Sequence, residues 1–497
     1  MIATGKVRPR YPSLYQINTR VWLTQLSKTL GKTATLDDIP DAELDALAQM
    51  GFDWIWLLSV WQTGRAAQEV SRTNPDWRRE FHETLPDLTE DDIPGSGFAI
   101  TGYTVHQTLG GDAALARLRA RLQQRGLKLM LDFVLNHMAL DHPWIENHPE
   151  RFVGGTDADL ARAPQNYTWI QRQAGDGIFA HGRDPYFDGW PDTLQLNYAN
   201  PAVQEAMIGE LLRISGQCDG LRCDMAMLVL PEVFERTWGK RAPLFWPTAT
   251  QRVRERVPGF TFMAEVYWDL EWTMQQQGFD YAYDKRLYDR LRERHARPAR
   301  EHLLAGLDFQ DKLARFLENH DEPRAAATFP PGVHQAAAVI TFLAPGLRLF
   351  HQGQFEGRKK RISPHLGRGP DESVDDLSLQ FYQRLLTLLK RPALRDGNWQ
   401  LLECTPAGEG NLTYDNYVAF AWTGCDSERL VVAVNYADSQ SQCHVRWPFA
   451  DRSEGRFRLS DLLSDASYEW NGQDLIARGL YLDEQAWKAR VFTVNPD

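Results

Sequence analysis

The stretch that decides the fold covers residues 112–137 and reads DAALARLRARLQQRGLKLMLDFVLNH. Its first half predicts a helix over 112–125, which ends at Gly126 because glycine tolerates the left-handed backbone that closes a helix. Three leucines at helical spacing line one face of this helix: Leu115, Leu118 and Leu122. The apolar run 127–133 follows at once and predicts a buried strand. A helix that leads straight into a buried strand is typical of an α/β fold.

Elsewhere in the chain, short apolar runs alternate with amphipathic stretches in the same way. The runs predict eight strands, at 15–18, 53–58, 127–133, 219–224, 261–266, 279–283, 314–318 and 347–351. Helical patterns fall between them, for example at 201–215, 333–342 and 376–390. Strands and helices in this alternation predict an α/β fold whose main domain is a closed parallel (β/α)8 TIM barrel.

Two segments are too long to be simple barrel connections. Residues 62–100 follow the second strand, and residues 138–198, rich in Asp, Pro and Gly, form an excursion after the third strand. Beyond Arg391-Pro392, strand-like runs separated by turn residues predict a C-terminal antiparallel β-sandwich domain. We therefore expect a barrel made of 1–137 and 199–394, a loop-rich insertion at 138–198 and the β domain at 395–497.

The composition limits the class of protein and its partners. The chain has 497 residues, of which 43% are hydrophobic and 24% charged, as in ordinary globular proteins. Its net charge of −11 argues against binding to nucleic acid. The five sparse cysteines indicate reduced thiols, so we expect a cytoplasmic protein. We expect no signal peptide and no membrane partner, because the apolar runs are short. The oligomeric state stays open.

Carboxylates stand at the ends of four predicted strands: Asp132, Asp224, Glu265 and Asp321. An apolar strand gains no stability from such an ending, because a buried charge is costly unless it is paired. One acid of this kind can cap a helix. Four on one barrel favour a catalytic site instead, because barrel enzymes carry their chemistry at the carboxyl ends of the strands.

The neighbours of two of these acids indicate different roles. Arg222 lies two residues before Asp224, so both side chains point to one face of the strand, and the guanidinium keeps the carboxylate ionised. Glu265 lies in an apolar setting, where desolvation raises a carboxyl pKa and suits a general acid. A carboxylate nucleophile together with a carboxylic acid is the equipment of retaining glycoside hydrolysis.

The four strand ends also carry motifs. They read Asp132-Phe-Val-Leu-Asn-His137, Gly220-Leu-Arg-Cys-Asp224, Ala264-Glu265 and Asn319-His-Asp321, in that order. This series resembles the four signature regions of the α-amylase family, glycoside hydrolase family 13. Gly102-Tyr103 resembles the family's segment with a stacking tyrosine, and 346–353 resembles its eighth strand. The resemblance covers roughly residues 10–395.

The resemblance implies a role for each matching residue. Asp224 attacks the anomeric carbon, Glu265 acts as acid and then base, and Asp321 holds ring hydroxyls more strongly as positive charge develops. The others bind or brace the sugar: Arg222 orients Asp224, His137 and His320 hold hydroxyls, Tyr103 supplies a stacking face, and Asp132 and Asn136 brace the site. No residue is assigned as a metal ligand.

The sequence departs from the family's pattern after the nucleophile. Many starch-cleaving members have a Lys-His pair where this chain has Met227 and Leu228, which argues against a long-starch α-amylase and weakens the case for the family's calcium site. Asn136 matches another calcium position. Three loop acids are further candidate ligands: Asp184, Asp188 and Asp192. We expect that no cofactor is required, with calcium as the alternative.

Two further segments bear on the substrate. Insertion 62–100 either walls the cleft into a pocket, which favours short substrates cut near an end, or is a plain surface loop. The basic segment 357–368 either pairs with nearby acids or binds an anionic group. Of the aromatic rings in predicted rim loops, one or two are expected to stack on sugar: Trp144, Trp190, Trp268 and Phe355.

These features lead to three hypotheses about function. The first is a retaining α-glycoside hydrolase that acts on a short α-glucoside or α-glucooligosaccharide through a covalent glycosyl-enzyme. The second is an α-glucosyl transferase or phosphorylase that uses the same intermediate. The third, a non-catalytic sugar-binding protein, is disfavoured because Asp224, Glu265 and Asp321 are all present. In each case the partner is a small saccharide or glucoside.

Overall fold

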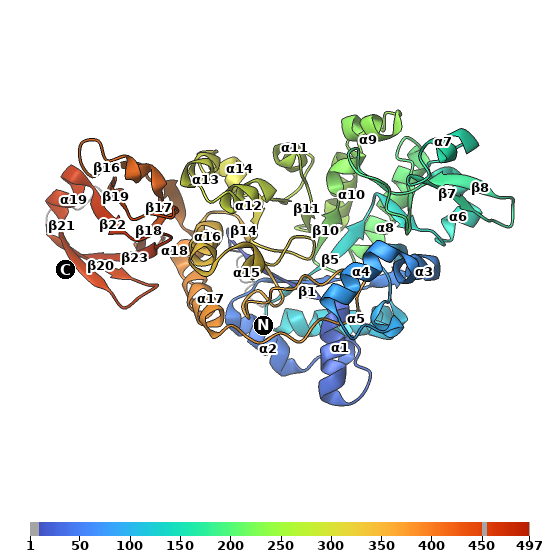
Figure 1. Cartoon of the computed structure of the whole chain (residues 1–497), viewed down its shortest axis with the longest axis horizontal. Helices are drawn as coiled ribbons and strands as arrows, with labels where there is room; N and C mark the ends of the chain where they lie inside the picture. Colours follow the sequence, from blue (N-terminus) through green and yellow to red (C-terminus); the bar gives the residue numbers. More distant parts are fainter. Residues whose placement is uncertain (1–8, 450–454, 497) are drawn as a thin grey trace.

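The computed structural model describes residues 9–449 and 455–496. Its centre is a closed barrel of parallel strands in the order β1-β14-β13-β12-β11-β10-β5-β2, as the sequence predicted (Figure 1). The strands are β1 (Ser13–Asn18), β2 (Trp54–Leu58), β5 (Lys128–Val134), β10 (Gly220–Asp224), β11 (Thr261–Ala264), β12 (Tyr281–Tyr283), β13 (Leu313–Arg315) and β14 (Leu347–His351). Each of them overlaps the apolar run that predicted it.

The helices lie around the outside of the barrel (Figure 1). They include α1 (Thr19–Leu30), α2 (Asp41–Met50), α5 (Gly111–Gln124), α8 (Pro201–Ile214), α10 (Trp246–Arg256), α12 (Lys285–Arg292), α16 (Pro331–Leu343) and α17 (Asp376–Leu389). Helix α5 buries its leucine face, and Gly126 with φ +74° follows it in the left-handed region. Among the described residues, none of these helices is long and apolar enough to cross a bilayer.

The insertion after β2 is a folded unit. It contains β3 (Trp61–Thr63), α3 (Arg65–Thr73), α4 (Pro75–Thr84) and the start of β4 (Ile100–Val105). Helix α4 begins where it does because the Asn74 side chain accepts hydrogen bonds from the backbone N–H groups of Asp76 and Trp77, with Pro75 in the first turn.

The excursion after β5 is built from short elements. It contains β6 (His137–Ala139), α6 (Trp144–Asn147), α7 (Asp157–Arg162), β7 (Tyr167–Ile170), β8 (Gly177–Ala180) and β9 (Thr193–Gln195). Strand β6 pairs with β9, so the excursion leaves the barrel and returns to it beside His137. It therefore forms part of the wall around the carboxyl ends of the strands.

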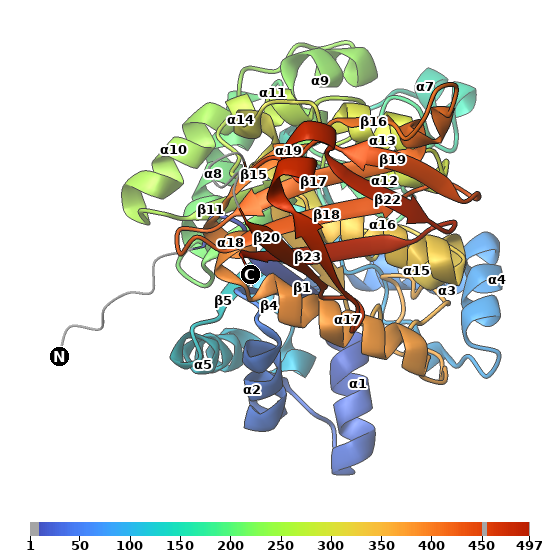
Figure 2. The ribbon, with the colours of Figure 1, turned by 90° about the vertical axis from the view of Figure 1, so that its left-hand side faces the viewer.

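The C-terminal region contains antiparallel sheets, as predicted. A six-stranded sheet has the order β15-β17-β18-β23-β20-β21, and a three-stranded sheet the order β16-β19-β22. Their strands are β15 (Asn398–Leu401), β16 (Cys404–Pro406), β17 (Tyr417–Thr423), β18 (Arg429–Asn435), β19 (Ser441–Val445), β20 (Arg456–Asp461), β21 (Ser467–Asn471), β22 (Leu480–Glu484) and β23 (Ala489–Pro496). In Figure 2 this region faces the viewer, in front of the barrel. The limits given above for the three parts of the chain remain a prediction.

Candidate active site

Strand register brings the predicted acids together. In the β5–β10 pair, Arg222 lies opposite Asp132, and in the β10–β11 pair, Cys223 lies opposite Ala264. Asp224 and Glu265 therefore end neighbouring strands at the same level. Asp321 follows β13 at the same end of the barrel. The carboxyl ends of the strands thus carry all four acids on one face.

One guanidinium lies at the centre of this group. Arg222 is fully buried, and its Nη1 lies 2.7 Å from Asp224 Oδ1, while its Nη2 lies 2.6 Å from Glu265 Oε2. The same group lies 3.4 Å from Asp132 Oδ1 and 3.8 Å from Asp321 Oδ2. A single cation therefore faces four carboxyl groups, and it cannot neutralise all of them.

The excess of acids has a direct effect on their protonation. Burial raises the pKa of Glu265, and the charges of Asp224 and Asp321 raise it further, while Arg222 opposes this. Burial also raises the pKa of Asp132 to about 7. The direction predicted for Glu265 from its apolar neighbours agrees with this arrangement. A protonated Glu265 can donate a proton at neutral pH.

Two further groups hold Glu265 in place. Met225 has φ +42°, an uncommon left-handed conformation for a side-chain-bearing residue, and its N–H lies 2.7 Å from Glu265 Oε2. The Tyr267 hydroxyl lies 2.8 Å from Oε1 of the same carboxyl. Neither contact could be predicted from the sequence, because both depend on the path of the loops that follow the strands.

Asp321 is held by its own loop and lies beside His320. The side chain of Asn319 accepts the backbone N–H groups of Asp321 and Glu322, each at 2.9 Å. The Gln16 Nε2 donates to His320 Nδ1 over 2.8 Å, and His320 Nε2 lies 3.2 Å from Asp321 Oδ2. Burial holds the pKa of His320 well below its usual range, so the ring is neutral and carries its proton on Nε2.

A pocket of about 310 Å³ opens over these groups. It is lined by Trp77, Ser96, Phe98, His137, Trp190, Asp192, Thr193, Asp224, Met225, Glu265, Tyr267, His320, Asp321, Pro364 and His365. Five of the predicted site residues are in this wall: Asp224, Glu265, Asp321, His137 and His320. Asp132 and Arg222 lie beneath it in the buried charge cluster.

Tyr103 does not lie where the resemblance placed it. Its side chain is 1% exposed, its hydroxyl donates to Val134 O, and its ring packs on Phe133 with centroids 5.5 Å apart. It is therefore a core residue and not a stacking face. Phe98, five residues earlier, lines the pocket instead and stacks on the His320 ring at 5.3 Å.

Two of the residues considered for calcium are already hydrogen-bonded within the protein, and a third is exposed. The Asn136 amide is paired with Gln195, which donates to its Oδ1 over 2.9 Å and accepts from its Nδ2 over 3.1 Å. Asp184 Oδ1 accepts two backbone N–H groups, and Asp188 is exposed. Within 9–449 and 455–496, no group of three or more His, Cys, Asp or Glu side chains is placed to hold a metal ion.

The basic segment 357–368 has protein partners. Arg361 Nη2 lies 2.5 Å from Glu80 Oε1, and Arg368 Nε lies 2.7 Å from Asp92 Oδ1. Lys360 Nζ donates to the backbone oxygen of Glu83 over 3.1 Å. Of the two interpretations of this segment, the structure favours pairing with nearby acids over an anion site.

The four rim aromatics lie in different surroundings. Trp190 lines the pocket, with its ring 5.1 Å from that of His137. Phe355 is buried against Tyr15, and Trp144 packs under the Arg151 guanidinium. One of the four predicted rings is therefore available to a ligand inside the pocket.

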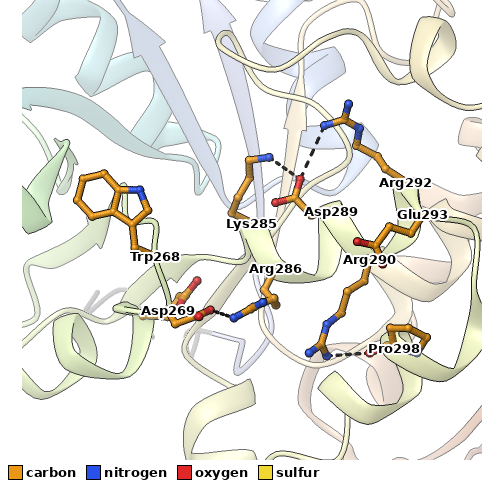
Figure 3. A pocket seen from close by; sticks show the side chains of 10 residues that line it. Trp268, Asp269, Lys285, Arg286, Asp289, Arg290, Arg292, Glu293 and Pro298 are labelled. Carbon is orange, nitrogen blue, oxygen red and sulfur yellow. Dashed lines mark hydrogen bonds and ion pairs between the residues drawn. The ribbon is translucent and has the colours of Figure 1, made fainter. Parts of the chain in front are cut away.

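Trp268 belongs to a different hollow, which is larger, about 770 Å³, and lies outside the pocket beside α12 (Figure 3). Charged side chains line it, and several of them are paired: Lys285 with Asp289 at 2.6 Å, and Arg286 with Asp269. None of the four acids at the strand ends lines this hollow, so it is separate from the acidic site.

Comparison with known proteins agrees with the geometry. The family model for the α-amylase catalytic domain matches residues 31–375. The α-amylase MalA of Haloarcula japonica is 25% identical over 356 residues, which cover 70% of this chain and 44% of that protein. An α-1,4-glucan:maltose-1-phosphate maltosyltransferase of Salinibacter ruber is 33% identical over 147 residues, 27% of this chain and 20% of that protein. The chain spans less than half the length of both relatives.

Solved structures of similar fold cover nearly the whole chain. The maltogenic α-amylase AmyB of Thermotoga neapolitana has a TM-score of 0.68 and 17% identity, with 97% of this chain and 98% of that chain covered. The α-amylase of Geobacillus thermoleovorans, solved in complex with acarbose, has a TM-score of 0.68 and 20% identity, with coverage of 99% and 100%. Both likenesses concern the fold, including the C-terminal sheets.

Proposed function

The chain belongs to the α-amylase family, and from this premise we propose that it is a retaining hydrolase of short α-glucosides or α-glucooligosaccharides. The observation that carries the proposal is the shared contact of Arg222 with two acids, Asp224 at 2.7 Å and Glu265 at 2.6 Å. It supports one ionised and one protonated carboxyl group at the same bond, which a two-step displacement requires.

The proposed reaction has two balanced steps. Asp224 attacks the anomeric carbon and forms a glycosyl ester as the bond to the leaving oxygen breaks, and Glu265 gives its proton to that oxygen. Glu265, now ionised, then takes a proton from water, whose oxygen attacks the same carbon and releases Asp224. The sugar leaves with its original configuration.

The remaining residues are proposed to hold the sugar ring. Asp321 and His320 face the pocket together and offer a carboxylate and an N–H to ring hydroxyls. His137 offers its imidazole to a hydroxyl from the opposite wall. Phe98 replaces Tyr103 as the proposed stacking face. Contacts that strengthen as the ring gains positive charge raise turnover, and Asp321 is placed to make such a contact.

A second candidate is an α-glucosyl transferase or phosphorylase, in which a sugar or phosphate takes the glycosyl group from Asp224. It is supported by relatives named as a maltosyltransferase and as the trehalose synthase/amylase TreS of Mycobacterium tuberculosis. Incubation with and without phosphate, and with added sugar acceptors, separates the candidates. Free sugar as the sole product supports hydrolysis. A sugar phosphate or a longer glycoside supports transfer.

The test of the proposal is turnover of an aryl α-glucoside by Asp224→Asn and Glu265→Gln. Loss of the nucleophile or of the acid is expected to lower kcat by at least about a thousandfold, while the circular dichroism spectrum and the melting temperature remain near those of the parent. Asp157→Asn, an exposed acid outside the pocket, serves as the control. Near-normal turnover by purified Asp224→Asn protein contradicts the proposal, as does an inverted first product in NMR.

The proposal also covers compartment and cofactor. Five free thiols, four of them buried, support a reducing compartment, and we propose the cytoplasm. Members of the family often bind calcium, but Asn136 has its amide occupied by Gln195. We therefore propose that activity requires no added metal.

A further inference from the structure

We propose that the pocket has room for only one sugar ring on the retained side of the cleaved bond, that is, the side whose sugar becomes attached to the enzyme. The protein then removes single sugar units from the non-reducing end of its substrate. This inference rests on the proposed function, because it takes Asp224 as the nucleophile and Glu265 as the acid. It adds the substrate class: glycosides with an unblocked terminal α-glucosyl unit and a leaving group of variable size.

Two segments far apart in the chain meet at one end of the pocket. Trp77 comes from α4, and Pro364 and His365 come from the loop after β14, and all three line the pocket. The Trp77 and His365 rings lie 4.4 Å apart between centroids. The Ser71 hydroxyl, on α3, lies 2.8 Å from His365 Nδ1 and fixes that ring. We call these contacts the end wall, defined by Trp77, Pro364 and His365.

The end wall has its own small core. Phe81, Leu85, Ile93 and Leu366 form a separate buried cluster, with Trp77 packed against it. The salt bridges of Arg361 with Glu80 and of Arg368 with Asp92 cross between the same two segments. Since both apolar packing and ion pairs join the segments, the end wall is a built part of the site. It is not a pair of independent surface loops.

The barrel order places the end wall opposite the acid. The insertion with α4 follows β2, and the loop with His365 follows β14, and these two strands flank β1 on either side. Glu265 follows β11, which lies four strands from β1 in either direction around the barrel. Because the leaving group must lie beside Glu265, the retained ring extends toward the end wall.

The side of the pocket next to Glu265 differs from the end wall. Tyr267 lines the pocket, but the next residue, Trp268, already lines the outer hollow, where its ring lies 4.9 Å from that of the exposed Tyr186. The path beyond the acid therefore leads outward over aromatic side chains. The pocket itself, at about 310 Å³, is at the lower end of the roughly 300–1,000 Å³ range of ligand sites. A second ring on the closed side would have to displace Trp77.

The wild-type protein tests this by its first products. We would incubate it with the 4-nitrophenyl glycosides of α-glucose, α-maltose and α-isomaltose and separate the products by chromatography. Glucose as the first sugar from either disaccharide glycoside, or cleavage of the glucoside alone, supports the inference. Release of intact maltose or isomaltose with nitrophenol overturns it. Cleavage of none of the three contradicts the proposed function itself, so the two failures are distinct.

A variant then tests the end wall directly. Trp77→Ala is expected to raise the release of intact disaccharide at least about tenfold relative to glucose, because the ring that blocks the second unit is gone. Arg79→Ala, on the exposed side of α4, is the matched control and is expected to leave the product ratio unchanged. Folded Trp77→Ala protein that still releases only glucose overturns the role of the end wall. The wild-type measurement does not depend on how this variant folds.

Discussion

At the scale of single residues, the hydroxyl of Tyr267 tunes Glu265, the proposed acid. It donates to Glu265 Oε1 over 2.8 Å and so favours the ionised carboxyl, against the burial that raises the pKa of Glu265. In its proposed role Glu265 works only when protonated, so we expect activity to be lost as pH rises through this pKa. In Tyr267→Phe we expect the alkaline limb of kcat/KM to move upward by about half a unit. The shift is measured from the pH profile of kcat/KM. The control is Tyr288→Phe, at a buried tyrosine outside the pocket. A downward shift would contradict the sign.

A second residue, Gln16, acts by positioning His320. Gln16 lies on β1, fully buried, and its amide donates to His320 Nδ1, which leaves the ring proton on Nε2, 3.2 Å from Asp321 Oδ2. In Gln16→Met the ring is free to carry its proton on Nδ1 and then presents a lone pair to the carboxylate. We expect kcat/KM to fall about tenfold, equivalent to one lost buried hydrogen bond. Gln310→Met, at a buried glutamine that bonds Arg315 and the His302 backbone, is the control. It is expected to lower the melting temperature more than activity, and the reverse pattern would refute the assignment.

At the scale of elements, the strands and their terminal acids could be predicted, but the walls around them could not. An apolar run of five to seven residues between helices has few alternatives to a buried strand, and β5 and β10 formed within a residue of their predicted limits. The place of Phe98 could not be predicted. Phe98 lies in a turn two residues before β4, where no strand alternation tells which way a ring points, and β4 itself pairs with β3 through register shifts. The end wall depends on contacts between segments some 280 positions apart, such as Arg361 with Glu80.

The core of the end wall gives a prediction at this scale. Phe81→Ala removes the largest ring from the small cluster and is expected to weaken this unit by about 3 kcal/mol or more, with little effect on the barrel core. Amide hydrogen exchange should then rise in α4 and in 357–368 but remain unchanged in β5 and β10. An equal rise in exchange across the whole chain would show that the end wall is not a local unit. Phe187→Ala, an exposed phenylalanine, is the control.

At the scale of the whole molecule, the sheets of the C-terminal region are part of the barrel's structure. Side chains of β17 alternate between the two faces of the six-stranded sheet. On one face, Val418, Phe420 and Trp422 belong to the same buried cluster as the barrel core. On the other face, Tyr417 and Ala419 belong to the cluster between the sheets. Trp422 donates to Leu343 O over 2.8 Å and meets Tyr11 edge-on. The barrel therefore buries one face of this sheet, and the two have a common core.

A common core predicts that barrel and sheet unfold together. Trp422→Ala should lower the free energy of unfolding by about 3–5 kcal/mol through loss of a large buried ring at the junction. The variant should also unfold in a single transition when the pocket and the sheet are followed by separate probes. Trp169→Ala, whose side chain is 55% exposed, is expected to change stability by less than about 0.5 kcal/mol. Denaturant melts followed by far-ultraviolet circular dichroism and by residual turnover would measure both. If the two probes separate already in the wild-type protein, the sheet folds on its own and the shared face is only a contact. If they coincide and shift together in Trp422→Ala, the barrel that carries the proposed catalytic acids depends on the C-terminal sheets for its stability.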